Sequence, residues 1–260
     1  MPFLDTIAKA RVGGVRYNSP TVQVAILGLV FCFTVGMFLA VSGLGAGGTQ
    51  DVSLADTANA VLYACFAIMG LFAGSVNNLL GVRLTLFLGS FGYALYMGSL
   101  WCFQTQGTRW FLITAGAILG ISAALFWAAQ GSVMMSVPLE SDKGRAYSIF
   151  WSIFQLGVVV GAAAAFGITD KQGSLPTVST GVYLAFIILI FLGMALTWTI
   201  LPPEYVVRGD GTIVKYQKAI GLREETRSFL AQFKDWRMLA LFPMCFASNY
   251  FYAYQGSLND

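Results

Sequence analysis

The sequence contains no histidine, and only 10% of its 260 residues are charged, whereas an ordinary soluble domain has about 25%. Without histidine, Ser/His/Asp and Cys/His catalysis, histidine metal sites and histidine-based proton switching are excluded. The formal net charge of +3 is too small to indicate a nucleic-acid partner. We therefore expect a protein that is not an enzyme, uses no metal or cofactor, and binds no nucleic acid.

Cysteine is scarce and poorly placed for chemistry. All four cysteines fall inside apolar runs without CxxC spacing, so neither a disulfide framework nor a metal site is expected. The first 20 residues contain Lys9, Arg11 and Arg16 but no apolar core. A cleavable signal peptide is therefore not expected, and the first membrane helix should direct insertion.

Long apolar runs are what the sequence has in abundance, since 57% of its residues are hydrophobic. The runs are about as long as the roughly 20 residues that a helix needs to cross a bilayer. The predicted fold class is therefore an all-α polytopic membrane protein, with the lipid bilayer as its main solvent. We predict helices over residues 22–42, 57–76, 82–103, 110–137, 146–168, 181–201 and 238–255.

The positive charges predict how these helices are oriented. All of the 15 Lys and Arg residues except Arg109 and Lys171 fall on one side of the predicted membrane. Because Lys and Arg stay on the cytoplasmic side, we place the N-terminus in the cytoplasm. The expected parts are a cytoplasmic N-terminus (1–21), a six-helix transmembrane bundle (22–201), a cytoplasmic linker (202–237), and a seventh helix with a short extracytoplasmic tail (238–260).

This layout matches the first half of a twelve-helix transporter of the major facilitator type, whose two halves are repeats of each other. A seven-helix receptor or rhodopsin would need its N-terminus outside. The seventh predicted helix also has no lysine for a retinal Schiff base. We therefore favour the N-terminal half of a major facilitator fold, followed by a linker and one further helix.

The stretch "GSVNNLLGVRLTL" follows the second predicted helix and resembles the G-x-L-A-D-R-x-G-R-R-x-x-L signature of major facilitator transporters. Gly74, Gly81, Arg83 and Leu86 fall on matching positions. Asn78 replaces the usual aspartate, so a charged latch becomes at most a neutral hydrogen bond, about half as strong. The alternative is a tight polar turn whose glycines let two helices approach, and both interpretations can hold together.

Three pairs of glycines are spaced four residues apart within the predicted helices. Small residues at this spacing let membrane helices pack closely where no hydrophobic force drives them together. We expect all three pairs to pack helices tightly. The pairs are Gly70 and Gly74, Gly116 and Gly120, and Gly157 and Gly161.

No Asp, Glu, Lys or Arg lies deep in a predicted span, so proton coupling through a buried carboxylate is not expected. Uncharged polar groups lie there instead. Arg145, Ser148, Ser152 and Gln155 are spaced 3, 4 and 3 apart, which places them on one helical stripe. A second stripe contains Asn59, Tyr63, Gly70, Gly74 and Asn77, and a third contains Trp127, Gln130 and Met134.

These stripes should turn away from lipid, because an unpaired amide in hydrocarbon costs about 2 to 7 kcal/mol. They either form interhelical hydrogen bonds or line a central cavity. Lys143, Gly144 and Arg145 form the cytoplasmic turn that places Gln130 and Gln155 on consecutive helices, and we expect these glutamines to lie close together. The cavity candidates are Trp127, Gln130, Ser152, Gln155 and Asn249.

Five stretches spread over nearly the whole chain resemble a known protein family. Each stretch alone is weakly specific, but their order and spacing together are strongly specific. They are "GLGAGGTQD" (43–51), "AGSVNNLLGVR" (73–83), "ALFWAAQGSVM" (124–134), "DKGRAYSIFWSIFQLGVVVGA" (142–162) and "FPMCFASNYFYAYQ" (242–255). With them the chain resembles the Unc-ninety-three-like family, the ion-channel-regulatory branch of the major facilitator superfamily, and most of all its fungal members.

The resemblance implies a major facilitator fold and a role in regulating ion channels or escorting other membrane proteins, by association with a membrane partner or with itself. The alternative is a facilitator-type transporter of a small neutral or amphipathic solute. Related proteins have about twelve helices, whereas this chain stops just after its seventh. We expect a truncated form, for which transport would require a second half or a dimer.

Overall fold

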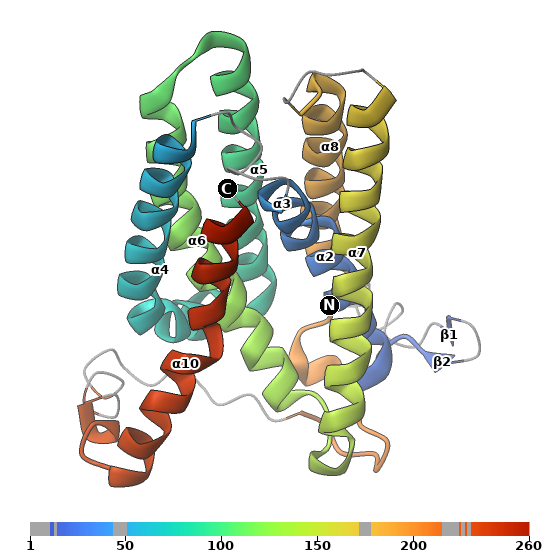
Figure 1. The fold of residues 1–260 in the computed structure, drawn as a ribbon. Helices are drawn as coiled ribbons and strands as arrows, with labels where there is room; N and C mark the ends of the chain where they lie inside the picture. The colour runs from blue at the N-terminus through green and yellow to red at the C-terminus, as the bar shows by residue number, and fades with distance from the viewer. Residues whose placement is uncertain are drawn as a thin grey trace. The chain divides into compact units, whose positions relative to one another are not determined.

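The computed structural model describes residues 11–12, 15–43, 51–171, 178–214, 224, 227 and 230–259, with side chains for all of these except 12, 15, 168–171 and 249–259. Six helical spans in this part are long and apolar enough to cross a membrane (Figure 1). The chain is therefore a multi-pass membrane protein of the all-α class, as predicted, with one pair of two-residue strands as the only strands among the described elements. The long helices are α2 (Pro20–Phe33), α3 (Val35–Ser42), α4 (Val52–Leu80), α5 (Val82–Gln106), α6 (Arg109–Ser136), α7 (Lys143–Lys171), α8 (Thr180–Leu196) and α10 (Trp236–Asn259).

Short elements join these helices at their ends. The strands β1 and β2 form a small antiparallel hairpin just before α2. The remaining short elements are single 3-10 turns before α7 and after α8. The short elements are β1 (Arg11–Val12), β2 (Val15–Arg16), η2 (Glu140–Asp142), η3 (Thr197–Thr199) and η4 (Pro203–Tyr205).

Capping residues set where the helices begin and end. Ser19 Oγ accepts a hydrogen bond from the backbone N–H three residues later (3.4 Å), and Pro20 follows where its missing N–H costs nothing. Asp51 caps α4 in the same way (3.0 Å). Gly81, between α4 and α5, and Gly107, after α5, have φ values of 78° and 68°, which favour glycine.

The first predicted helix is broken at Thr34 into α2 and α3. Thr34 has φ −103° and ψ −78°, outside ordinary helical geometry. Its Oγ1 donates to the backbone oxygen of Val30 at 2.6 Å, a contact of the kind that bends helices. The single helix expected over 22–42 is therefore one span made of two helices.

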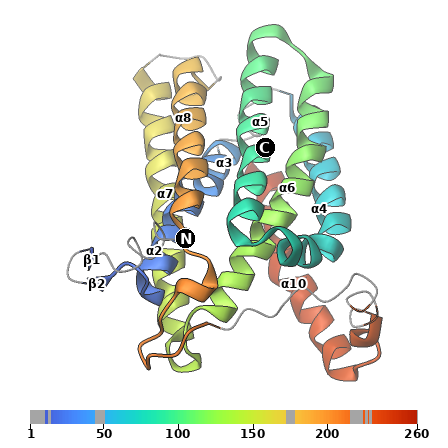
Figure 2. The same ribbon diagram turned by 180° about the vertical axis from the view of Figure 1, so that it is seen from behind.

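The six spans belong to one compact unit, Met1–Gln217, and form two groups within it. In one group α4 and α5 both pack on α6, and in the other α7 and α8 pack on α2, with α7 also on α3. Contacts between α5 and α8 join the groups. Figure 1 shows α4 and α7 on the near side of this unit, and Figure 2 shows α5 and α8 on the opposite side.

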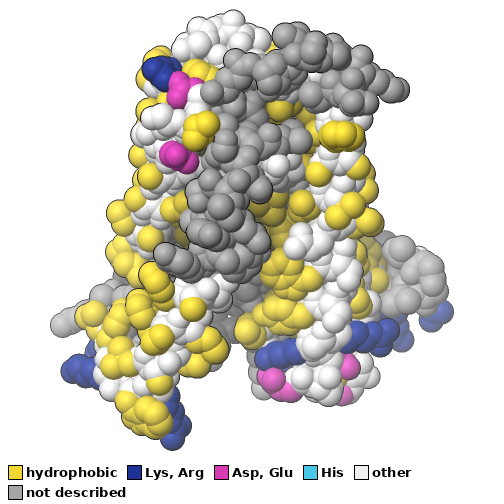
Figure 3. Space-filling view, in the orientation of Figure 1, with side chains coloured by type: hydrophobic (Ala, Val, Ile, Leu, Met, Phe, Trp, Pro, Cys, Tyr) yellow, Lys and Arg dark blue, Asp and Glu magenta, His cyan; other side chains and the backbone are white. Residues whose placement is uncertain are grey.

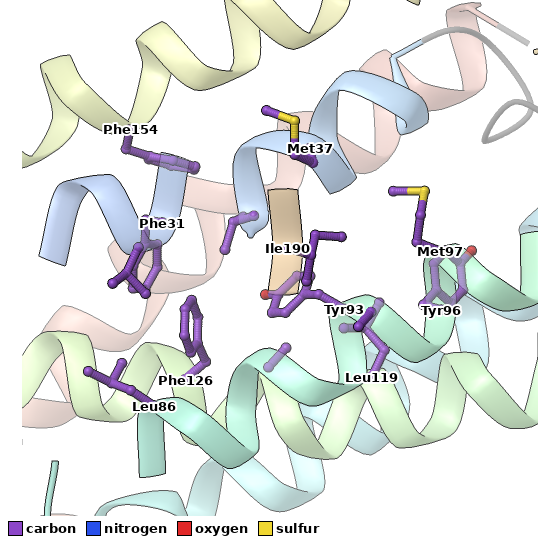
Figure 4. Close-up of a cluster of buried hydrophobic side chains, with 14 of the residues drawn as sticks. Phe31, Met37, Leu86, Tyr93, Tyr96, Met97, Leu119, Phe126, Phe154 and Ile190 are labelled. Carbon is purple, nitrogen blue, oxygen red and sulfur yellow. The ribbon is translucent and has the colours of Figure 1, made fainter. Parts of the chain in front are cut away.

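A cluster of aromatic rings joins the two groups at the centre. Phe31 of α2 stacks on Phe126 of α6 with ring centroids 4.3 Å apart. Phe150 and Phe154 of α7 meet Phe31 edge-on at 5.1 and 5.8 Å. Figure 4 shows Phe31 between Phe154 and Phe126. Each such pair contributes about 0.5 to 1.5 kcal/mol beyond burial, so the cluster stabilises the junction of α2, α6 and α7.

Glycines set the closest helix contacts. A Cβ atom at Gly120 of α6 would lie 2.2 Å from the backbone oxygen of Leu62 on α4. A Cβ atom at Gly157 of α7 would lie 2.7 Å from the backbone oxygen of Cys32 on α2. Because both obstacles are backbone atoms, neither could move aside. The packing prediction is confirmed for the two glycine pairs that contain these residues.

The segment after α8, residues 200–214, crosses the ends of several helices, and we call it the strap. Gln23 of α2 is 1% exposed, and its Nε2 donates to the Tyr17 backbone oxygen at 2.8 Å. The Leu201 N–H donates to Gln23 Oε1, also at 2.8 Å. Val206 and Val214 are buried in the main core. The first part of the predicted linker therefore packs on the six-helix unit.

Arg208 attaches the strap to the end of α6. Its Nη2 donates to the Ser136 backbone oxygen at 2.6 Å, and its Nε donates to the Val137 oxygen at 3.2 Å. A cation at a helix C-terminus also interacts favourably with the helix dipole. At the exposed turn of the strap, hydrogen bonds from Thr212 hydroxyl (2.7 Å) and N–H (2.9 Å) to Asp210 lower the pKa of that carboxyl.

The second compact unit, Lys218–Asp260, contains α10. This helix has 24 residues and includes Pro243 in its interior. Asp235 precedes it, and its Oδ1 accepts a hydrogen bond from the Arg237 N–H at 2.9 Å. The seventh helix predicted over 238–255 is therefore confirmed as a helix.

Candidate functional site

The polar stripe predicted on α7 occupies one face of that helix. Arg145, Ser148, Ser152 and Gln155 are all exposed at the surface of the six-helix unit. We expected this stripe in the interior, but the opposite face of α7, which contains Phe154, packs on α2 instead. The sequence predicted the shared face correctly. Within the unit this face is not buried, because the aromatic residues and close-packed glycines of α7 lie on the opposite side, and its role as a cavity lining stays a prediction.

Gln155 and Ser152 are the informative members of this face. Both lie well inside the span, and within the described part of the chain neither side chain has a hydrogen-bond partner. Ser148, nearer the start of α7, donates to the Gly144 backbone oxygen at 3.0 Å. Because bare amides and hydroxyls in hydrocarbon cost about 2 to 7 kcal/mol, this face is suited to a polar contact from outside the unit.

The outer face of α4 also lacks a covering element within the six-helix unit. Tyr63 and Phe72 are 59% and 58% exposed. A Cβ atom at Gly70 or Gly74 would meet no atom within 4 Å among the described residues. The packing predicted for this pair is therefore wrong within the unit, because the inner face of α4 is the one that packs on α6.

The third stripe, on α6, lies in or against the core, and its member Met134 is fully buried. Trp127 is half-buried, with its ring 5.0 Å from Phe31 and 6.4 Å from Trp151, while Gln130 is only 7% exposed. No hydrogen bond joins Gln130 to Gln155 among the residues described. Their expected proximity and the cavity wall both stay predictions. The fifth candidate, Asn249, lies in α10, and its side chain is outside the described residues.

The motif after the second span acts through backbone geometry and one arginine. Gly74 is exposed, Asn78 is half-buried, and Gly81 provides the positive φ between α4 and α5. Arg83 Nε donates to the Ile200 backbone oxygen at the start of the strap. Gly81 therefore forms the predicted turn and Arg83 attaches it to the segment after α8, but a Cβ atom at Gly74 or Gly81 would meet no described atom within 4 Å, so these glycines do not bring two helices together there.

The turn before α7 presents one free cation. Lys143 Nζ lies 2.6 Å from Glu140 Oε1. Gly144 is exposed and a Cβ atom there would meet nothing within 4 Å. Arg145 is exposed and has no acceptor or acidic partner among the residues described. Arg145 is therefore the cation of this turn that no described residue binds.

A groove of about 590 Å³ lies between α5, α6 and α8, and sequence reasoning missed it. Its wall includes Gly98 and Trp101 from α5, Phe111 from α6, and Ile187 and Phe191 from α8. The wall is mostly apolar, and its residues come from three separate helices. No local pattern in the sequence could have predicted it.

Among the described residues, no group of three His, Cys, Asp or Glu side chains could hold a metal ion.

Comparison with known proteins gives a consistent result. The profile of the family described as "Ion channel regulatory protein UNC-93" matches residues 56–253. An UNC93-like protein of Schizosaccharomyces pombe is 42% identical over 246 residues, which is 94% of this chain and 49% of that protein. UNC93-like protein 1 of Arabidopsis thaliana is 41% identical over 243 residues, covering 92% and 52%.

A more distant relative is the UNC93-like protein MFSD11 of Xenopus laevis, 26% identical over 194 residues, covering 70% of this chain and 42% of that protein. The chain spans about half the length of the relatives it matches. The matched region includes the outer face of α4, the α7 face and most of α10. The family profile covers most of the chain, and identities above 40% extend over nearly all of it, so the chain belongs to the UNC-93 family.

Proposed function

We propose that this protein docks a helix of another membrane protein and thereby regulates or escorts that partner, with an ion channel as one such partner. The observation that carries the proposal is the exposed polar face of α7. Ser152 and Gln155 lie inside a membrane span without a hydrogen-bond partner in the described residues. A partner helix that presents a polar side chain would satisfy them, whereas lipid tails would not.

The outer face of α4 supports the same proposal. It lies on the same side of the unit as α7 (Figure 1). Gly70 and Gly74 leave the backbone of α4 open to close approach by another helix. The family description as an ion-channel regulatory protein agrees with this role. We place the N-terminus in the cytoplasm and assign the protein no catalytic activity.

The test uses site-specific photo-crosslinking in native membranes. A photoreactive residue at position 152 should give discrete protein adducts, because a docked helix lies beside it. The matched control is position 191, since Phe191 is 48% exposed on α8, on the opposite side. We expect mainly lipid adducts from the control. Lipid adducts alone from position 152 would contradict the proposal.

Two substitutions sharpen this experiment. Gly74→Leu should block close approach of a partner and abolish the adduct, while the fold is kept because its Cβ has free space. Gly98→Leu is the matched control, because Gly98 also has nothing within 4 Å but lies on α5, on the opposite side. Equal adduct yields from both variants would mean that the α4 face is not part of the docking surface.

A second candidate function is transport of a small neutral or amphipathic solute. The supporting observation is that the Trp127 and Trp151 rings lie 6.4 Å apart, with Trp151 directly next to Ser152 in sequence on α7. Aromatic faces and uncharged polar groups together suit such a solute. Transport by alternating access needs two halves, so a second half or a second copy must supply the other wall.

Uptake into vesicles separates the two functions. Transport predicts that Gln130→Ala and Gln155→Ala reduce solute flux while the protein still inserts and unfolds at its normal temperature. Docking alone predicts no flux in the wild type, and it predicts that adduct formation is reduced by Gln155→Ala but not by Gln130→Ala. Flux that survives both substitutions would exclude these glutamines as solute ligands.

A further inference from the structure

The β1–β2 hairpin places two arginines directly opposite each other. Arg11 pairs with Arg16 in the antiparallel register, and both side chains are exposed. Residues directly opposite in such a pair have Cβ atoms about 4.5 to 5.5 Å apart, and like charges there destabilise the pairing. Neither arginine has an acidic partner among the described residues. An anion shared by the two guanidinium groups would remove this repulsion.

Four other cations among the described side chains of the first unit differ from these arginines because they are already occupied. Their acceptors belong to the chain itself, so they serve its own packing. Arg145, by contrast, is exposed and has no acceptor in the described part of the chain. The occupied cations are Arg83 with Ile200, Arg109 with Asp51, Arg208 with Ser136 and Val137, and Lys143 with Glu140.

These three arginines lie at the same end of the helices. Arg16 precedes the start of α2 by four residues, a distance of at most about 14 Å in extended chain. Arg145 is in the first turn of α7, which packs on α2. Figure 3 shows Lys and Arg side chains in a band from the foot of α7 toward the hairpin, with acidic side chains below the band.

We propose that Arg11, Arg16 and Arg145 form a basic rim that binds the phosphate groups of anionic phospholipids in the adjoining leaflet. A guanidinium group donates paired hydrogen bonds to phosphate oxygens. Juxtamembrane arginines each gain roughly a fivefold preference from an anionic surface. The rim shares Arg145 with the polar face of α7, whereas Arg11 and Arg16 belong to the hairpin and lie outside that face. It holds the N-terminal hairpin against the membrane at the start of the first span.

The experiment measures hydrogen exchange of the hairpin amides in the purified protein, in nanodiscs of purely zwitterionic lipid and in nanodiscs that also contain phosphatidylserine. Phosphatidylserine should slow exchange at Arg16 and its neighbours, because bound headgroups hold the hairpin closed. The double substitution Arg11→Gln and Arg16→Gln should abolish the difference. Arg11→Lys with Arg16→Lys should retain part of it, because the charge remains without the bidentate geometry.

The control variant is Lys143→Gln, which removes a nearby cation that is already paired with Glu140. It should leave the phosphatidylserine effect unchanged. Inorganic phosphate added to zwitterionic nanodiscs distinguishes the two sources of phosphate. Equal slowing of exchange by free phosphate would overturn the assignment to lipid. The proposal would also fail if the phosphatidylserine effect survived the double glutamine substitution, or if Lys143→Gln removed that effect. Loss of the effect at high salt supports an electrostatic origin.

Discussion

Two glycine pairs of the same spacing lie on the two sides of α4. The pair on the inner side belongs to α6 and is enclosed, and the pair on the outer side belongs to α4 and is open. On the inner side, Gly120 of α6 lies so close that a Cβ atom would reach 2.2 Å from a backbone oxygen of α4. On the outer side, Gly70 and Gly74 of α4 itself face open space among the described residues. The spacing therefore permits close approach but does not determine which neighbour uses it. The enclosed pair holds the fold together, and the open pair is available to a partner.

The largest expected effect comes from filling the enclosed position. Gly120→Leu would place a side chain against the Leu62 backbone oxygen, which cannot move without displacing α4. Overpacking of this kind costs about 1 to 3 kcal/mol or more, and here we expect the upper end and loss of the folded protein in mild detergent. Gly74→Leu should change stability by no more than about 0.5 kcal/mol. Thermal unfolding followed by tryptophan fluorescence compares the two.

The comparison would fail if Gly74→Leu lowered the unfolding temperature as much as Gly120→Leu. That result would mean that the outer face of α4 is covered within the purified chain. Gly120→Ala provides a graded control, because even a single methyl group meets the same backbone oxygen. Its unfolding temperature should lie between those of the wild type and Gly120→Leu.

Gln23 and Gln155 extend the comparison from glycines to polar side chains. We expect their substitution to change stability less than Gly120→Leu does. Gln23→Leu removes the acceptor of the buried Leu201 N–H and the donor to the Tyr17 oxygen. Leaving a buried group unpaired costs about 1 to 3 kcal/mol, so the unfolding temperature should fall. Gln155→Leu removes an exposed amide without a partner in the described residues and should be neutral or stabilising. A large loss of stability with Gln155→Leu would contradict its assignment to an open face.

Much of the fold could be predicted because membrane helices have a strong local signal. The six spans and the helix over 238–255 follow from apolar runs, and Gly81 marks the turn between α4 and α5 at a positive φ. The break at Thr34 was missed, because one threonine within an apolar run gives no warning of a bend. A hydroxyl that bonds to the preceding turn is visible only in the structure.

The candidate site was predictable only in part. The residues of the α7 stripe were found from their spacing, but their exposure was not, since both faces of α7 contain apolar residues. The strap was missed for a different reason. Arg83 and Arg208 donate to backbone oxygens, at Ile200 and at Ser136 and Val137. Every residue has such an oxygen, so the sequence has no pattern that marks these acceptors.

The smallest expected effect concerns Asp210 and tests whether a fully exposed side chain can still contribute to the free energy of unfolding. Asp210 lies at the exposed turn of the strap, yet the hydrogen bonds from Thr212 lower the pKa of its carboxyl. A carboxyl with a lowered pKa in the folded state adds stability above its unfolded pKa of about 3.9. That contribution is lost as the pH falls through the lower folded value. The difference in unfolding temperature between wild type and Asp210→Asn should therefore be constant near neutral pH and shrink below about pH 4. Thr212→Val removes the hydroxyl donor and should also reduce this difference in unfolding temperature. A difference that does not change with pH would show that the charge of Asp210 is not involved.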